Sequence, residues 1–345
     1  MKQYPRPSEF IGMLHVPVNT ILTSSSVNRG ETYLPVATKE DWELVISLEE
    51  DFCTILQSPR AEFIRFQDLN RIYGVLEEKA SAFSFVPFLS ERMLKEAEMY
   101  FRYSADALML ENIAAPYFVR NRQPVAIIAI MSLLARELRQ AYGASRFGIQ
   151  VLAFSDDLAL IIALRHGFQF IRSETALFAG LRPEGKTPNQ GNLANLYAMR
   201  NCWHAMSPDA DPRGLPLVYV DLRKKHTIFP PGLDQLAFWT ENLVFQKVEG
   251  AILTGSATGI PVDGDELHNL RQAIDSYSSH SSPFSWEAKL LIGSGVTIEN
   301  LAFCRHFADA IIVGSALKRN GYWENDLDEE RLGKFMEAWS KMSKE

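Results

Sequence analysis

Ionisable side chains follow several short apolar segments of this chain, and their types suit acid–base, covalent and metal chemistry. Imidazoles and carboxylates can move protons or bind a divalent cation such as zinc or manganese, and a lysine can form a Schiff base or contact a phosphate. The candidate catalytic residues are His15, Glu111, Asp221, Lys225 and His226, and the predicted ligands of a divalent metal are His15, Glu111 and Asp221. Hydrogen bonding at the rim of the fold is an alternative for each of them, and either carboxylate could instead pair with Lys225 or Arg172.

A second group of residues could bind an anion. Two turns, Gly-Ser-Gly and Gly-Ser, each follow an apolar segment, and small residues let backbone N–H groups approach a bound phosphate. A helix predicted to begin near Thr297 would add the partial positive charge of its N-terminus. The predicted phosphate or ligand contacts are Asn112, Arg172, Gly255, Ser256, Gly293, Ser294, Gly295, Gly314 and Ser315.

Apolar segments that alternate with helical patterns would position these residues. The predicted strands are residues 10–16, 106–110, 146–152, 169–172, 215–221, 250–253, 289–292 and 310–313. Continuous apolar strands fit a parallel sheet that is covered on both faces. Strand–helix units of this number favour a closed (β/α)8 TIM barrel of the α/β class over an open, doubly wound sheet. In such a barrel the chemistry lies at the carboxyl ends of the strands, a rule that also selects Gln150, and phosphate lies after strands 7 and 8.

Residues 17–90 do not continue this alternation. We predict that they form an inserted helical segment between strands 1 and 2 of a single barrel domain, residues 1–345, with a helix over 39–56. A Phe-rich stretch follows that helix, and it predicts a packed satellite core or, if exposed, a surface for a protein partner or a second copy of the chain. Because the insertion leaves the carboxyl end of a strand, we expect it over or beside the barrel mouth.

The composition of the 345 residues is that of a globular protein, with 47% hydrophobic and 22% charged residues. A net charge of -7 without a basic run argues against nucleic acid as a partner. Three widely separated cysteines, Cys53, Cys202 and Cys304, indicate a reducing compartment. No segment reaches the ~18 to 20 apolar residues of a membrane span, and the first residues lack the apolar region of a signal peptide. We therefore expect a soluble protein of the cytoplasm or an organelle stroma.

The motifs resemble those of the BtpA/SgcQ family of (β/α)8 proteins from Phe10 to Trp339, apart from the insertion. The matching stretches are IGMLHVP, ADALMLEN, FGIQVL, FIR, VDLRKKH, AILTGSATG, LIGSGVTIEN and ADAIIVGSALKRNG, with Lys318 and Gly321 in register. The exits of strands 1 to 4 depart from the family pattern, because VPVNTI replaces a Leu-Pro-Pro-Leu-Pro-Gly run and Gln150 stands where Asn is common. The half of the chain with strands 5 to 8 is kept, which favours a shared anion site over an identical substrate.

The resemblance leaves two functions open. It implies a link to photosystem I accumulation in cyanobacteria for some members, while others look like enzymes of sugars or nucleosides. One hypothesis is a protein that binds a phosphorylated sugar or nucleoside-like compound at the barrel mouth and catalyses lyase or hydrolase chemistry on it. The other is a non-enzymatic assembly or stability factor that docks through the insertion. The altered loops of strands 1 to 4 favour the second, and the polar rim with its phosphate-type turns favours the first.

Overall fold

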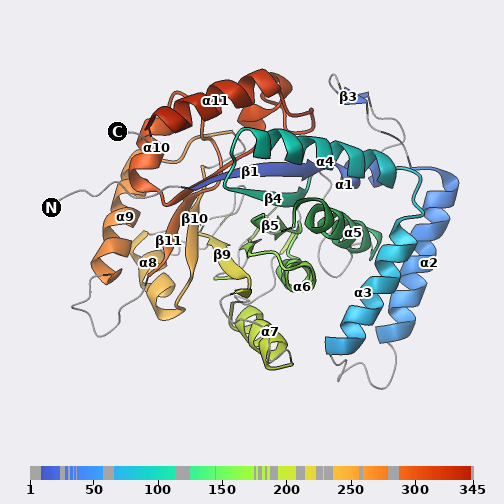
Figure 1. Ribbon diagram of the computed structural model, residues 1–345. Helices are drawn as coiled ribbons and strands as arrows, with labels where there is room; N and C mark the ends of the chain where they lie inside the picture. The colour runs from blue at the N-terminus through green and yellow to red at the C-terminus, as the bar shows by residue number, and fades with distance from the viewer. Residues whose placement is uncertain are drawn as a thin grey trace.

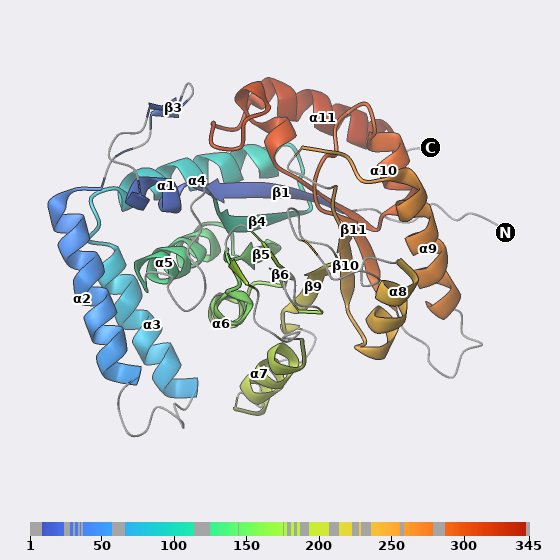
Figure 2. The same cartoon turned by 180° about the vertical axis from the view of Figure 1, so that it is seen from behind.

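Eight parallel strands form a closed barrel at the centre of the protein (Figures 1 and 2). The structure is a computed structural model that describes residues 9–23, 28–29, 32–33, 35, 37–56, 66–113, 125–143, 145–174, 176–177, 181–182, 185–186, 193–206, 214–222, 228, 236–255, 259–278 and 287–342. The barrel strands are β1 (Glu9–Val16), β4 (Ala107–Asn112), β5 (Phe147–Gln150), β6 (Phe170–Ser173), β9 (Leu217–Asp221), β10 (Gly250–Leu253), β11 (Lys289–Ile292) and β12 (Ala310–Val313). They pair in the order β1-β12-β11-β10-β9-β6-β5-β4, and β4 pairs with β1. The predicted (β/α)8 fold class is therefore confirmed.

Helices cover the outside of the barrel; all but the last of them connect one strand to the next, and the last follows β12 (Figure 1). They are α4 (Val86–Arg102), α5 (Val125–Tyr142), α6 (Asp156–His166), α7 (Leu193–Met206), α8 (Leu236–Phe245), α9 (Gly264–Ser278), α10 (Leu301–Phe307) and α11 (Glu329–Met342). As predicted, α6 ends at Gly167, whose φ of 65° is left-handed. In α11, Phe335 and Trp339 pack on Phe10 with ring centroids 5.7 and 6.1 Å away. These contacts hold the last helix against the first strand.

The inside of the barrel is filled by side chains at alternate strand positions. One buried cluster contains Met13 of β1, Met109 of β4, Phe170 of β6 and Tyr219 of β9. The rings of Phe170 and Tyr219 stack with their centroids 5.3 Å apart. On β5 this level is occupied by Gly148, because a Cβ there would lie 2.0 Å from the Phe170 ring. Since side chains alternate along a strand, the residue two positions further on also points inward, at the carboxyl end.

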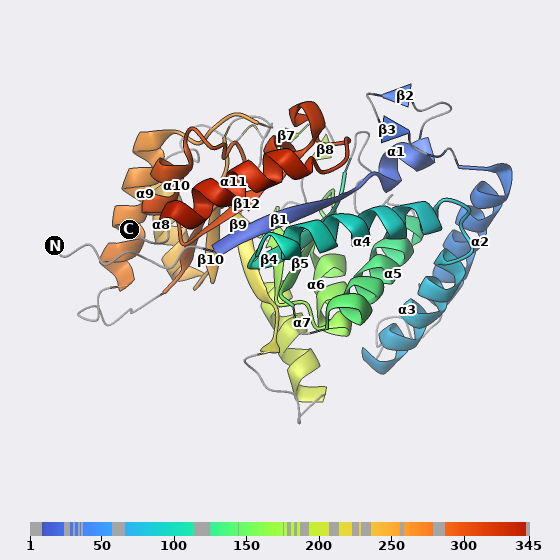
Figure 3. The same cartoon turned by 45° about the horizontal axis from the view of Figure 1, so that its top comes forward.

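Long helices between β1 and α4 pack on the flank of the barrel (Figure 3). The segment contains α1 (Val18–Thr23), β2 (Asn28–Arg29), β3 (Thr32–Tyr33), α2 (Lys39–Leu56) and α3 (Phe66–Ala80). The sequence predicted α2 with these bounds but not α3. Both helices contact α5, and Glu77 of α3 reaches His166 in the last turn of α6, far from the mouth. We expected this segment over or beside the mouth; the structure instead places α2 and α3 along the side, because apolar residues of α3 are buried there.

Two further features of the chain bear on the predictions. The aromatic rings of Phe83 and Phe85 are buried, with centroids 5.3 Å apart, so these members of the Phe-rich stretch belong to the core.

In the loop after β6, β7 (Leu181–Arg182) and β8 (Gly185–Lys186) form a small antiparallel ribbon. No helix of the described part of the chain is long and apolar enough to cross a membrane.

Candidate functional site

The alternation along the strands brings polar side chains to the inside of the barrel at its carboxyl end. They are His15 of β1, Glu111 of β4, Gln150 of β5, Arg172 of β6 and Asp221 of β9. The strand register places His15 beside Glu111, and Glu111 beside Gln150. All of them are largely buried. The structure therefore assembles one polar layer from residues that the sequence selected separately.

His15 and Glu111 face each other across the β1–β4 ladder. Nε2 of His15 lies 3.6 Å from Oε2 of Glu111, and only 7% and 12% of the two side chains are exposed. A neighbouring carboxylate can orient an imidazole ring, and the imidazole can exchange a proton with a ligand at this point of the mouth. His15 and Glu111 are thus an imidazole and a carboxylate placed side by side at the carboxyl end of the barrel. We refer to them as the acid–base pair, after the chemistry that these two groups can perform.

Arg172 and Asp221 form the second pair of the layer. Nε of Arg172 donates to both carboxylate oxygens at 3.2 Å, and Nη2 donates to Oδ1 at 2.8 Å. Burial by itself lowers the pKa of Arg172, but the charge and hydrogen bonds of Asp221 raise that pKa above its ordinary value. Nη1 also donates to the carbonyl oxygen of Gly293 at 3.4 Å. One alternative left open by the sequence, a carboxylate paired with Arg172, is therefore present.

This second pair changes the prediction of a metal site. Both oxygens of Asp221 accept hydrogen bonds from Arg172, so a positive charge already faces this carboxylate. Among the residues that the structure describes, no group of three or more His, Cys, Asp and Glu side chains is arranged to hold a metal ion. His15 and Glu111 are close together, but the predicted set with Asp221 as third ligand is not assembled.

The turns after β11 and β12 contain backbone N–H groups that make no hydrogen bond within the described part of the chain. Those of Ser294, Gly295, Gly314 and Ser315 have no acceptor among the described residues, whereas the N–H of Gly293 donates to the carbonyl oxygen of Leu253 at 2.9 Å. The buried hydroxyl oxygen of Ser294 also lacks a partner within the described ranges. Donors of this kind can hold an anion.

The helix after β11 begins later than predicted. α10 starts at Leu301 and not near Thr297. The side chain of Asn300 accepts a hydrogen bond from the N–H of Thr297 and donates one to the carbonyl oxygen of Gly295, both at 2.8 Å. Asn300 therefore organises this turn, and the turn itself must supply the donors that the sequence assigned to a helix N-terminus.

Packing explains the glycines that end β11 and β12. A Cβ on Gly293 would lie 3.1 Å from Nη2 of Arg172, and a Cβ on Gly314 would lie 2.8 Å from Cε1 of His15. These glycines thus make room for the charged side chains of the polar layer. Gly293 and Gly314 therefore affect the site by leaving space for Arg172 and His15, independently of any contact with a ligand.

Other predicted contacts have different environments. The amide of Asn112 donates to the carbonyl oxygen of Leu152 and accepts from its N–H, both at 2.7 Å, so this side chain anchors the loop after β5. A Cβ on Gly255 would lie 2.0 Å from the carbonyl oxygen of Ile260, so this glycine allows a close contact between backbones. We leave both out of the proposed ligand contacts. Three predicted site residues lie outside the described residues: Lys225, His226 and Ser256.

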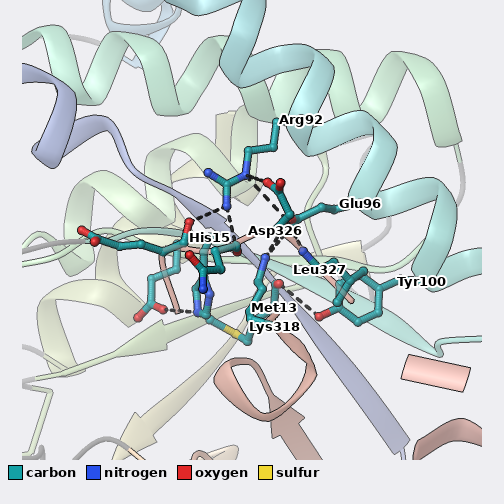
Figure 4. Close-up of polar contacts among 11 residues, drawn as sticks. Met13, His15, Arg92, Glu96, Tyr100, Lys318, Asp326 and Leu327 are labelled. Atoms are coloured by element: carbon teal, nitrogen blue, oxygen red, sulfur yellow. Dashed lines mark hydrogen bonds and ion pairs between the residues drawn. The ribbon is translucent and has the colours of Figure 1, made fainter. Parts of the chain in front are cut away.

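A buried ionic network joins the loop after β12 to α4 (Figure 4). Nζ of Lys318, which is 0% exposed, donates to both oxygens of Glu96 at 2.7 and 2.6 Å. Arg92 lies 3.2 Å from Asp326 and 3.7 Å from Glu96, and the N–H of Leu327 donates to Glu96 as well. The sequence analysis did not predict this network. Two features of the sequence indicated it: Lys318 matches a family motif, and Arg92 and Glu96 are four residues apart on one helix.

A closed barrel of eight parallel strands, with polar side chains gathered at the carboxyl ends of those strands, defines a (β/α)8 protein. Within this class the chain belongs to the BtpA family, because the sequence model of that family matches residues 87–341. The match begins one residue after the start of α4, and it confirms the resemblance inferred from the motifs.

Relatives from distant organisms share most of the chain. An uncharacterized mitochondrial protein of Caenorhabditis elegans is 29% identical over 253 residues, which is 71% of this chain and 82% of that protein. The photosystem I biogenesis protein BtpA of Synechocystis is 27% identical over 283 residues, 80% of this chain and 90% of that protein. Among solved structures, phosphoribosyl anthranilate isomerase from Thermus thermophilus is 12% identical, with a TM-score of 0.44 over 72% of this chain and 94% of that chain. That identity is too low to say what this chain binds.

Proposed function

We propose that this BtpA-family barrel binds a phosphorylated sugar or nucleoside-like compound at its mouth and catalyses lyase or hydrolase chemistry on it. One observation carries the proposal: the buried pair of His15 and Glu111 lies next to turns whose backbone N–H groups lack acceptors in the described part of the chain. β1 and β12 are neighbours, and Gly314 at the end of β12 meets the imidazole of His15. An anion held at the turns would therefore lie beside an acid–base group.

The two pairs of the polar layer, His15–Glu111 and Arg172–Asp221, have different roles in the proposal. In the proposal, the turns at Ser294 and Gly314 hold the phosphate, and His15 moves a proton with Glu111 orienting it. Arg172 neutralises negative charge that develops on the substrate, a contribution worth several kcal/mol in a site closed from water. Asp221 holds the guanidinium in place. Lys225 and His226 follow β9 in the sequence and stay in the proposal as substrate contacts. His226 would also join His15 and Glu111 as a ligand of a divalent metal.

The test is ligand binding followed by turnover. Inorganic phosphate and ribose 5-phosphate should raise the melting temperature of the wild-type protein, and Ser294→Asp should abolish both shifts because a carboxylate repels the anion. Ser294→Ala is the matched control: it loses one hydroxyl contact but keeps the backbone donors, so it should retain a reduced phosphate shift. Phosphorus NMR of sugar phosphates incubated with wild type, His15→Asn and Glu111→Gln then checks turnover, which both variants should lose. Equal phosphate shifts for wild type and Ser294→Asp, or no shift at all, would reject the anion site.

A second candidate function is an assembly or stability factor, and an exposed apolar face on the helical segment after β1 favours it. On α2, Trp42 and Ile46 are four residues apart and 43% and 57% exposed. A relative of 27% identity is a photosystem I biogenesis protein. If this function holds, Trp42→Ser with Ile46→Ser should reduce the co-purification of a partner protein while the phosphate shift is unchanged. Retained co-purification would reject this surface.

A further inference from the structure

Gln150 differs from every other member of the polar layer in its hydrogen bonding. Its side chain is 0% exposed, and neither Oε1 nor Nε2 has a hydrogen-bond partner among the described residues. Asp221 and Arg172, by contrast, bond to each other. A buried amide that makes no hydrogen bond loses the water it had in the unfolded chain and gains nothing in return. Such a group in a native structure is a candidate for a partner that arrives later.

The position of Gln150 at the end of β5 determines where a hydrogen-bond partner for its amide must lie. Gln150 is the last residue of β5, next to Glu111 in the register, and it follows Gly148 on the inward face of that strand. Its amide therefore faces the inside of the barrel at the level of the acid–base pair. In the closed order of strands, β5 lies opposite β11, which carries Ser294 at its exit. A ligand held at Ser294 must cross the mouth to reach Gln150.

We propose that Gln150 recognises hydroxyl groups of the substrate at the end remote from the phosphate. The proposal rests on the function proposed above and narrows its substrate to a polyhydroxy phosphate that is long enough to span the mouth. An amide offers one acceptor and one donor side, so Oε1 takes a hydrogen bond from one hydroxyl while Nε2 donates to its neighbour. Glu111 on β4 and Arg172 on β6 flank Gln150, and Gln150 itself is buried. Burial strengthens the discrimination between a hydroxyl and a methylene, because a methylene would leave the amide unpaired.

A second buried atom supports a ligand that spans the mouth. The hydroxyl oxygen of Ser294 has no hydrogen-bond partner within the described ranges either, and it belongs to the turn assigned to the phosphate. The two unsatisfied side chains thus lie at opposite sides of one opening, at β5 and after β11. Inorganic phosphate could satisfy Ser294 but not Gln150. A sugar phosphate could satisfy both.

The chain provides a matched control for this glutamine. Gln169 precedes β6 at the other end of the barrel, and both of its amide atoms are used: Oε1 accepts from the N–H of Phe147 at 2.8 Å, and Nε2 donates to the carbonyl oxygen of Gly167 at 2.7 Å. Replacement by methionine keeps the length of either side chain and removes its polarity. Gln169→Met should lower the melting temperature, while Gln150→Met should leave it unchanged or raise it, because no hydrogen bond is lost.

The experiment measures affinities of wild type, Gln150→Met and Gln169→Met by calorimetry for ribose 5-phosphate, pentyl phosphate and inorganic phosphate. Pentyl phosphate has five carbons and a phosphate but no hydroxyl on its chain. We expect wild type to prefer ribose 5-phosphate over pentyl phosphate by at least tenfold. Gln150→Met should lose that preference with unchanged affinity for inorganic phosphate, and Gln169→Met should keep it. Gln150→Leu serves as the second apolar variant should Gln150→Met not fold.

The outcomes separate this inference from the function on which it rests. A preference that survives in Gln150→Met, or a wild type that binds both organic phosphates equally, overturns the role of Gln150 while the anion site stands. A wild type that binds none of the three phosphates overturns the proposed function and this inference with it. A drop in melting temperature of Gln150→Met as large as that of Gln169→Met would show that Gln150 has a structural partner, and would also overturn the inference.

Discussion

Lys318 and Glu96 form a fully enclosed ion pair in which Nζ lies 2.7 and 2.6 Å from the two carboxylate oxygens. The pair joins the loop after β12 to α4 (Figure 4). Lys318 comes three residues after Ser315, so we expect the pair to restrain the turn of Gly314 and Ser315 as well. Removal of one partner leaves an uncompensated buried charge. We expect Lys318→Met to lower the free energy of unfolding by about 3 to 5 kcal/mol and to weaken phosphate binding, measured by urea unfolding and by thermal shift.

The control for this prediction is an exposed lysine pair. Nζ of Lys334 contacts Glu330 on α11, with 65% and 77% of the side chains exposed, so Lys334→Met should have no measurable effect on stability or on phosphate binding. The double variant Lys318→Met with Glu96→Gln should be more stable than Lys318→Met alone. A double variant that loses as much as the sum of the single changes would contradict the coupling.

The Arg172–Asp221 pair gives a second prediction. Asp221→Asn keeps the shape of the side chain but leaves the buried guanidinium with a neutral partner, so we expect a loss of about 3 to 5 kcal/mol in the free energy of unfolding. Glu329→Gln breaks an exposed pair with Arg102 and should leave stability unchanged. If Asp221→Asn proves as stable as Glu329→Gln, Asp221 does not hold Arg172, and its assignment as a catalytic group regains support.

Glu77 gives a prediction about pH. Although burial by itself raises its pKa, hydrogen bonds from His166 and Ser132 and the charges of His166 and Arg165 lower the pKa from an ordinary 4.5 to about 2. Arg136 also lies 3.3 Å away. A carboxyl whose pKa is lower in the folded than in the unfolded state stabilises the fold above pH 4.5 and loses that effect as the pH falls towards 2. The shift corresponds to about 3 kcal/mol.

Glu77→Gln should therefore reduce the free energy of unfolding at pH 7 and flatten its dependence on pH between 4.5 and 2. Urea unfolding at a series of pH values measures both effects, and Glu330→Gln on the surface is the control. Because Glu77 joins α3 to α5 and α6, protease should also cut within α3 faster in Glu77→Gln. Parallel pH profiles of wild type and Glu77→Gln would contradict the assignment.

The fold was largely predictable because its signals are local. Buried parallel strands appear as short apolar runs, and α2 and α6 have the predicted bounds. α3 was missed because Gly74, a weak helix former, lies in the middle of its sequence. α10 was started too early because Thr297 has the chemistry of an N-cap, whereas the N-cap residue is Asn300. The side chain of Asn300 accepts from the N–H of Thr297 and makes no cap hydrogen bond to the helix.

The site was predictable only in part, for a different physical reason. Strand ends and the alternation of side chains are enough to place His15, Glu111 and Asp221 at one mouth. The pairing of Glu96 with Lys318 joins residues 222 positions apart, so it depends on how the closed barrel brings α4 to the last loop. The sequence assigned the glycines of the turns to a ligand. In the structure, Gly293 and Gly314 lack a side chain because Arg172 and His15 occupy the adjacent space.

Gly314 links the anion turn to the acid–base pair, and this contact gives the last prediction. A Cβ added at Gly314 would lie 2.8 Å from Cε1 and 3.1 Å from Nε2 of His15, so Gly314→Ala must displace the imidazole and change its contact with Glu111. We expect a loss of about 1 to 3 kcal/mol in stability and a change in the imidazole nitrogen resonances of His15. The loss should shrink in the double variant with His15→Ala, which removes the clash. Gly74→Ala on α3, where nothing lies within 4 Å, should instead stabilise the protein by about 0.5 to 1 kcal/mol. Unchanged His15 resonances in Gly314→Ala would show that the turn can move without disturbing the acid–base pair, and the close coupling of phosphate and proton transfer would be lost.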